Sequence, residues 1–170
     1  TYVGTTSINA GVLNIANAGA LGTVAGATTV SSGAALEIQG GITTLAEPLT
    51  LGGGGINNSG ALRNVSGANT FAGPLTLTGA TRINSEAGTL TLSNTNTYNG
   101  ATTINTGTLA VSGDIANSGL VINSGGIISP GTSAAADSFG TSSITINGGG
   151  YNWTLSSANG SAGTGYDQIT

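Results

Sequence analysis

Several residue types that support catalysis and covalent cross-linking are absent from this chain of 170 residues. It contains no cysteine, no histidine and no lysine, and only 5% of its residues are charged, against roughly 25% in typical soluble proteins. Without cysteine there is neither a disulfide framework nor a redox motif. The missing residues also exclude Ser-His-Asp and Cys-His arrangements, lysine nucleophiles and the usual ligands of transition metals.

The charge balance excludes two classes of partner. The only basic residues are Arg63 and Arg82, and the net charge is −4. Nucleic-acid binding needs a basic face that releases counterions from phosphates, and binding to anionic membrane surfaces needs similar basic residues. No run approaches the roughly 20 apolar residues of a membrane-spanning helix. We therefore expect no nucleic-acid partner and no membrane insertion by this segment.

The residues that are abundant indicate β-structure. Glycine fills 31 positions, and Ser, Thr and Asn fill much of the remainder, a mixture that also occurs in flexible linkers. The Leu, Ile and Val residues, however, lie in short runs that alternate with small polar residues, and Gly, Ser or Asn bounds each run. This is the period-2 pattern of half-buried strands. Such runs cover residues 6–9, 13–15, 36–38, 49–51, 75–77, 90–92, 102–105, 109–111, 120–123 and 144–147.

An internal repeat distinguishes between the possible β-folds. The sequence of residues 1–13 returns in residues 97–109 without a gap, and a weaker copy opens at residues 70–73. An apolar residue followed by Asn or Ser, then Gly, then a strand recurs mostly at intervals of about 20 residues, the length of one solenoid unit. Coils of this size cannot bury their own apolar faces, so they stack as a solenoid. The prediction is an all-β, parallel β-helix (β-solenoid) of roughly eight coils of about 20 residues, on the order of 40 Å long.

Asparagine follows the apolar strand residue in several of these units. Stacked asparagine side chains can form hydrogen bonds along a solenoid axis as an amide ladder, and asparagine tolerates left-handed turn conformations. We predict a ladder through Asn84 and Asn105, with Asn9 and Asn123 in equivalent turns. The alternative is that these are ordinary turn asparagines.

Residues 96–109 closely resemble the autotransporter-associated β-strand repeat of bacterial surface proteins, with residues 1–13 as a second copy and 70–77 as a degenerate one. Parts of 128–170 are similar to the segment that often follows these repeats. The resemblance implies one right-handed parallel β-helix over residues 1–170, with β-strand repeats in 1–127 and C-terminal coils in 128–170. It also implies a segment of a longer protein, export to the extracellular bacterial cell surface, and an adhesive or spacer role. It transfers no catalytic residue and no cofactor.

Carboxylates are the only residues left for acid–base or calcium chemistry, and β-helix enzymes that act on polysaccharides exist. Glycoside hydrolysis needs two carboxylates that face each other. The six acids are widely spread, and we expect only Asp114 and Asp137 to recur near the coil period. The prediction is a protein without catalytic, cofactor or metal sites. The acids are Glu37, Glu47, Glu86, Asp114, Asp137 and Asp167.

Three functions fit these observations. The first is a structural or adhesive stalk that contacts a host or neighbouring cell surface, or a polysaccharide. The second is a self-assembling extracellular fibre subunit, because an uncapped solenoid has open strand edges that can pair end to end with another copy. The third is a glycan-binding module in which Tyr151 and Trp153 stack on sugar rings; the alternative for these two rings is packing under a loop.

Overall fold

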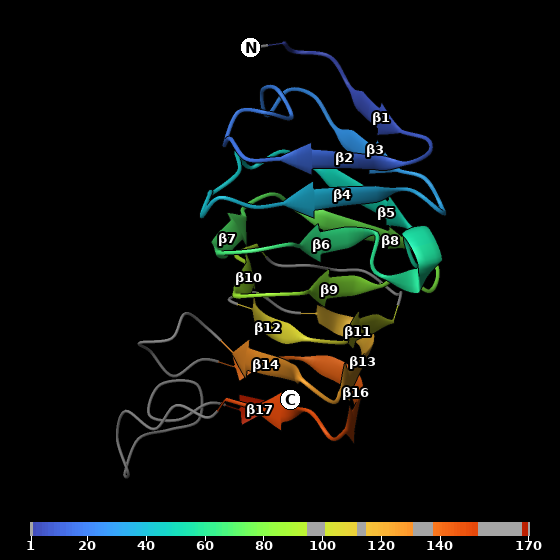
Figure 1. Cartoon of the computed structure of the whole chain (residues 1–170), viewed down its shortest axis with the longest axis vertical. Coiled ribbons are helices and arrows are strands. Elements are labelled where there is room, and N and C mark those ends of the chain that lie inside the picture. The colour runs from blue at the N-terminus through green and yellow to red at the C-terminus, as the bar shows by residue number, and fades with distance from the viewer. Residues whose placement is uncertain (1, 95–100, 112–114, 131–137, 153–167, 170) are drawn as a thin grey trace.

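The computed structural model describes residues 2–94, 101–111, 115–130, 138–152 and 168–169. Its short strands run in parallel and lie one above another along the long axis (Figure 1). The first face is a sheet of four strands, β1 (Thr6–Ile8), β3 (Thr28–Val30), β5 (Leu49–Gly52) and β8 (Leu75–Thr78).

The second and third faces continue further along the axis. The second face contains β2 (Val12–Ile15), β4 (Ala35–Ile38), β6 (Leu62–Asn64) and β9 (Ile83–Ser85). Below β9 it is extended by a separate sheet of β11 (Thr102–Ile104), β13 (Ile115–Asn123) and β16 (Thr141–Asn147). The third face contains β7 (Ala68–Phe71), β10 (Thr89–Leu92), β12 (Gly107–Val111), β14 (Gly126–Pro130) and β17 (Gly150–Tyr151). A small sheet pairs β15 (Ser138–Phe139) with β18 (Gln168–Ile169).

These faces confirm the predicted parallel β-solenoid. In Figure 1 the strands β2, β4 and β6 cross the front from right to left, and the chain returns behind them while it descends. This winding is right-handed, as in nearly all parallel crossovers. The second face has seven successive strands from β2 to β16, which makes about six turns rather than the predicted eight. The coils are close to the predicted length: strands of the first face begin at Thr6, Thr28, Leu49 and Leu75, and only the last interval is clearly longer. The count is lower mainly because the six turns span β2 to β16 and not the whole chain.

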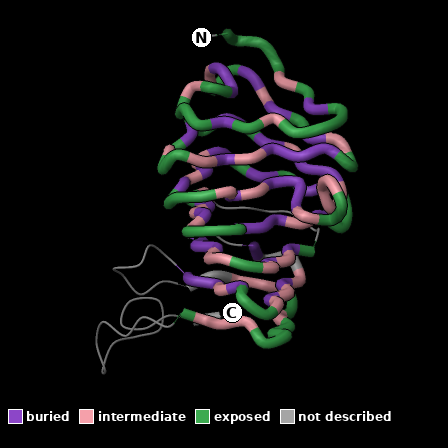
Figure 2. Tube along the Cα trace, in the orientation of Figure 1, coloured by how far each residue is buried: buried purple, intermediate pink, exposed green. Residues whose placement is uncertain are grey.

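The alternation in the sequence produces a continuous apolar core. In β5 and β8 the leucines are buried and point inward, while Thr76 between them is exposed. Parallel register places like residues above one another, as with Leu51 and Leu77. Figure 2 shows the buried residues along successive turns of the tube. Burial of these columns supplies most of the stability, because no single coil can exclude water from its own side chains.

Glycine at the corner between the second and third faces allows the turns to stack closely. Gly67 and Gly88 both have positive φ, at 82° and 78°, a conformation that is costly for residues with a Cβ. A Cβ on Gly88 would also lie 2.3 Å from the carbonyl oxygen of Gly67. At Gly88 glycine is therefore required both by the turn conformation and by the neighbouring coil.

One corner carries an insertion. The connection from β5 to β6 is about twice as long as the connections from β3 to β4 and from β8 to β9, which leave the same face at the same corner. The insertion contains the 3₁₀ turn η1 (Ile56–Asn58), in which Asn57 and Asn58 have positive φ values of 51° and 59°. Hydrogen bonds from Ser59 Oγ to Ile56 O (2.6 Å) and from Gly60 N to Gly54 O (2.8 Å) fix its shape. The Gly-rich stretch at residues 52–55 is thus part of a protrusion that its own hydrogen bonds hold in shape.

Candidate functional site

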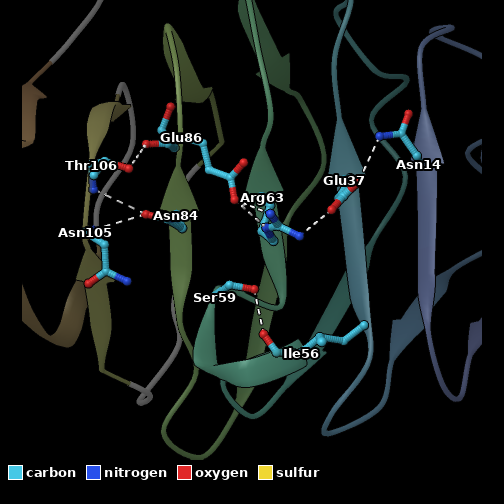
Figure 3. Close-up of polar contacts among 10 residues, drawn as sticks. Asn14, Glu37, Ile56, Ser59, Arg63, Asn84, Glu86, Asn105 and Thr106 are labelled. Carbon is cyan, nitrogen blue, oxygen red and sulfur yellow. Dashed lines mark hydrogen bonds and ion pairs between the residues drawn. The ribbon is translucent and has the colours of Figure 1, made fainter.

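A column of polar side chains runs along the outward side of the second face (Figure 3). The register of β2, β4 and β6 aligns Asn14 with Glu37 and Glu37 with Arg63. Arg63 forms ion pairs with Glu37 and with Glu86 of the next coil. Asn14 Nδ2 donates to Glu37 Oε2 at 2.9 Å. Opposite charges at strand spacing attract, whereas like charges in register would repel, so Arg63 between two glutamates is the favourable order.

Sequence analysis did not predict this column. Glu37 and Glu86 lie two coils apart, and each forms an ion pair with Arg63 on the coil between them. Glu37 and Glu86 lie 26 and 23 residues from Arg63 along the chain. These intervals are longer than the predicted coil of about 20 residues, so the repeat did not indicate this alignment. The guanidinium lies between the carboxylates, so the cluster is an ion-pair bridge and not a facing pair of acids. Asp114, Asp137 and Asp167 lie outside the described residues.

Amide groups form a second chain of contacts, at the ends of the lower strands. Asn123 Nδ2 donates to Asn105 Oδ1 at 2.8 Å, and Asn147 Nδ2 donates to Asn123 Oδ1 at 3.2 Å. Asn84 joins this chain differently, because its Oδ1 accepts the backbone N–H of Asn105 at 3.2 Å. The ladder was predicted through Asn84 and Asn105; the side-chain amide contacts lie instead between Asn105 and Asn123 and between Asn123 and Asn147.

Asn9 lies elsewhere. It follows β1 at the corner between the first and second faces, and its Oδ1 accepts a hydrogen bond from Ser31 Oγ at 3.3 Å. The structure therefore does not bring Asn9 together with Asn84, Asn105 and Asn123. Its sequence context is the same, but its repeat copy occupies a different corner.

A buried amide cluster at the next corner was not anticipated. Asn64 and Asn69 are fully buried. Asn64 Nδ2 donates to Ser85 Oγ (3.1 Å) and Ala87 O (2.9 Å), and Asn69 Oδ1 accepts the backbone N–H of Ile42 at 2.7 Å. Buried polar groups persist only when they are hydrogen-bonded. These contacts tie three successive coils together, a structural role.

The aromatic residues proposed for glycan contact are only partly described. Tyr151 is half-buried and packs against the apolar core. Trp153 lies outside the described residues. Beside Tyr151, on the outward side of the third face, is an open hollow of about 280 Å³. Its lining is uncharged and mostly small: Ala68, Thr89, Thr91, Thr108, Ala110, Ser129 and Asn152.

The described residues contain little that could perform acid–base or metal chemistry. Glu47 is fully buried; its Oε1 accepts a hydrogen bond from Thr28 Oγ1 at 2.7 Å, while Oε2 has no hydrogen-bond partner among the described residues. In the described ranges no group of three or more His, Cys, Asp or Glu residues is placed to hold a metal ion. Within those same ranges no helix is long and apolar enough to cross a membrane.

Comparison with known proteins identifies the repeat. The family model described as passenger-associated-transport-repeat matches residues 1–15 and 85–111. No curated protein and no solved structure matches the chain. The two matched segments contain the two copies that are visible as an internal repeat, and the weaker copy at 70–77 lies outside them.

The two copies occupy different faces of the solenoid. In the first copy the strands are β1 and β2, on the first and second faces; in the second they are β11 and β12, on the second and third faces. Each copy is a strand, a glycine-containing corner and a second strand, so the repeat specifies a corner and not a fixed place in the coil. Two segments of the chain therefore match the passenger-associated-transport repeat, which confirms the resemblance to the repeats of autotransporter passengers.

Proposed function

We infer that this chain is a structural stalk segment of a passenger-type bacterial surface protein, located outside the cell and without catalytic activity. The observation that carries this proposal is the stacking of parallel strands, coil upon coil, around one apolar core. A solenoid of this kind is stiff along its axis, since each coil is held by its neighbours through backbone hydrogen bonds and shared side-chain columns. Such a segment suits the task of holding other parts of a protein at a distance.

The arrangement of the titratable groups supports a role without catalysis. Glu37 and Glu86 are bridged by Arg63, and Glu47 is buried against Thr28. General acid–base catalysis needs a titratable group that can reach a substrate. Neither the bridged nor the buried carboxylates offer a pair of acids facing a shared cleft.

The outward side of the first face supports an adhesive contribution. Its central column contains only hydroxyl side chains, from Ser7, Thr29, Thr50 and Thr76 in register. A flat, uncharged hydroxyl surface can exchange hydrogen bonds with a polysaccharide or a neighbouring cell surface. The contact would be weak per coil and would gain strength only through repetition along a longer stalk.

A second candidate function is self-association into fibres. Strands β1 and β2 stand at the edges of their sheets, and unpaired parallel edges pair readily with another strand. Near this edge Val3 and Val12 are 68% and 47% exposed. A coil from a second copy would cover these side chains and satisfy the open backbone groups.

Negative-stain electron microscopy of the purified chain across a range of concentrations separates the two candidates. Single short rods at every concentration would support the stalk. Filaments that lengthen with concentration and show a regular axial repeat would favour the fibre subunit. Compact round particles would contradict both.

A further inference from the structure

A hollow of about 150 Å³ lies where the insertion between β5 and β6 meets the corner of the next coil. Gly54 and Asn58 of the insertion form one wall, and Thr81, Arg82 and Thr103 form the other, with two alanines. It is on the outside of the solenoid, at the corner between the first and second faces. Nothing in the stalk function requires it.

The electrostatics of this hollow differ from those of the polar column. The chain has two basic residues, and Arg63 is neutralised by two glutamates. Arg82 is half-buried and forms no ion pair within the described residues. Its Nη1 donates to the backbone carbonyl of Asn58 at 3.0 Å, a contact with a neutral group. A guanidinium has five N–H donors in a planar fork that matches a carboxylate, and a carbonyl satisfies only one of them.

The walls of the hollow are held in place before any ligand binds. Arg82 N donates to Gly53 O at 3.3 Å, which anchors the insertion to the coil below, and Gly60 N closes the loop onto Gly54 O. The Cβ that an alanine would add at Gly54 would lie 2.3 Å from Asn58 Oδ1, so the Asn58 side chain packs directly on the loop. Preorganised walls reduce the entropy lost on binding.

We propose that this hollow binds an acidic sugar residue, with the sugar carboxylate on the Arg82 guanidinium. The hollow is too small for an extended peptide but admits one ring-sized group. Beside the guanidinium it presents neutral polar groups, the Asn58 amide and the Thr103 hydroxyl, and no described residue forms a hydrogen bond with that hydroxyl. A ligand that carries hydroxyls next to one carboxylate fits this combination.

Amide NMR titration of the whole chain tests the proposal, with glucuronate as the probe and glucose as its neutral counterpart. Glucuronate is expected to shift the amide signals of Gly54, Asn58 and Arg82, and glucose is expected not to shift them. Arg82→Gln should weaken glucuronate binding at least tenfold. The control Val24→Glu changes the net charge by the same −1 at a distant exposed side chain, and it should bind within twofold of the parent chain.

Three outcomes would overturn the proposal. One is the absence of any shift at about 100 mM glucuronate, where a site with a Kd of about 1 mM is filled. Another is equal weakening by Arg82→Gln and Val24→Glu, which would mean that net charge alone governs binding. The last is binding of a tri-aspartate peptide as tight as that of glucuronate, which would show that the hollow recognises a carboxylate and not a sugar. Unchanged backbone signals elsewhere in Arg82→Gln would show that the variant is folded.

Discussion

Three glycine-to-alanine substitutions separate the two reasons why this solenoid needs glycine at its corners. Gly79 has a φ of +84° but no atom within 4 Å of an added Cβ. Gly73 lacks a positive φ, yet an added Cβ would lie 1.8 Å from the backbone oxygen of Glu47 in the coil above. Gly88 combines a φ of +78° with a Cβ position 2.3 Å from Gly67 O. The three variants thus test strain alone, stacking alone, and both.

The magnitudes follow from these geometries. A left-handed φ costs a residue with a Cβ about 1–2 kcal/mol, and the loss of unfolded-state entropy returns about 0.4–1 kcal/mol. Gly79→Ala should therefore lower the free energy of unfolding by about 1 kcal/mol. Overpacking against a backbone carbonyl costs about 1–3 kcal/mol, which is the loss expected for Gly73→Ala. Gly88→Ala incurs both costs and should lose about 2–4 kcal/mol.

Urea unfolding followed by circular dichroism, with the unfolding midpoint and slope fitted together, measures these differences. A lower slope would reveal a variant in which only part of the stack unfolds cooperatively. The expected order of destabilisation is Gly79→Ala, then Gly73→Ala, then Gly88→Ala. If Gly73→Ala were neutral, or if Gly88→Ala matched Gly79→Ala, the close approach of successive coils at these corners would be wrong.

Three further substitutions test other parts of the structure by the same unfolding assay. Leu36→Ala removes a fully buried side chain and should cost about 2–5 kcal/mol through lost transfer energy and a cavity; a cost under about 1 kcal/mol would mean that Leu36 is not in the core. Arg63→Gln leaves Glu37 and Glu86 without their counter-ion and should cost about 1–3 kcal/mol. That cost should shrink modestly as salt is added, because salt screens the more exposed Arg63–Glu86 pair of the parent chain more than the half-buried Arg63–Glu37 pair; a cost that rises with salt would refute the electrostatic role. Asn123→Ala breaks two amide contacts and should cost about 1–2 kcal/mol, whereas Asn9→Ala, outside the chain of amides, should cost less.

The sequence predicted the fold class because its pattern is local. All ten predicted strand runs overlap observed strands, since alternation and Gly, Ser or Asn boundaries are readable within a few residues. In the middle of the chain, strand β6 was not predicted, for two reasons. Its outward Arg63 and its inward Asn64 interrupt the apolar alternation, and the insertion before it breaks the coil period. Asn64 is tolerated inside only because Ser85 and a neighbouring carbonyl satisfy its amide.

The polar sites were less predictable because they depend on register between coils. Nothing local in the sequence indicates that Glu37 and Glu86 lie on either side of Arg63, since this follows from the pairing of strands that are a full coil apart along the chain. The amide contact between Asn105 and Asn123 could have been predicted from the sequence, because each asparagine follows an equivalent strand. Asn9 has the same local context but lies at another corner, so the repeat alone did not determine its neighbours.

Disulfide trapping tests the stacked parallel register most directly, because the chain contains no native cysteine. Thr29 and Thr50 are register partners on adjacent strands, and Thr50 and Thr76 are the next pair. Adjacent strands lie about 4.8 Å apart, within the range of Cα separations that a disulfide spans, whereas residues two strands apart exceed the limit of about 7 Å. The account predicts that the double variant Thr29→Cys/Thr50→Cys forms an intramolecular disulfide on mild oxidation and that Thr29→Cys/Thr76→Cys does not. Efficient cross-linking of Thr29→Cys/Thr76→Cys, or none in Thr29→Cys/Thr50→Cys, would contradict the solenoid.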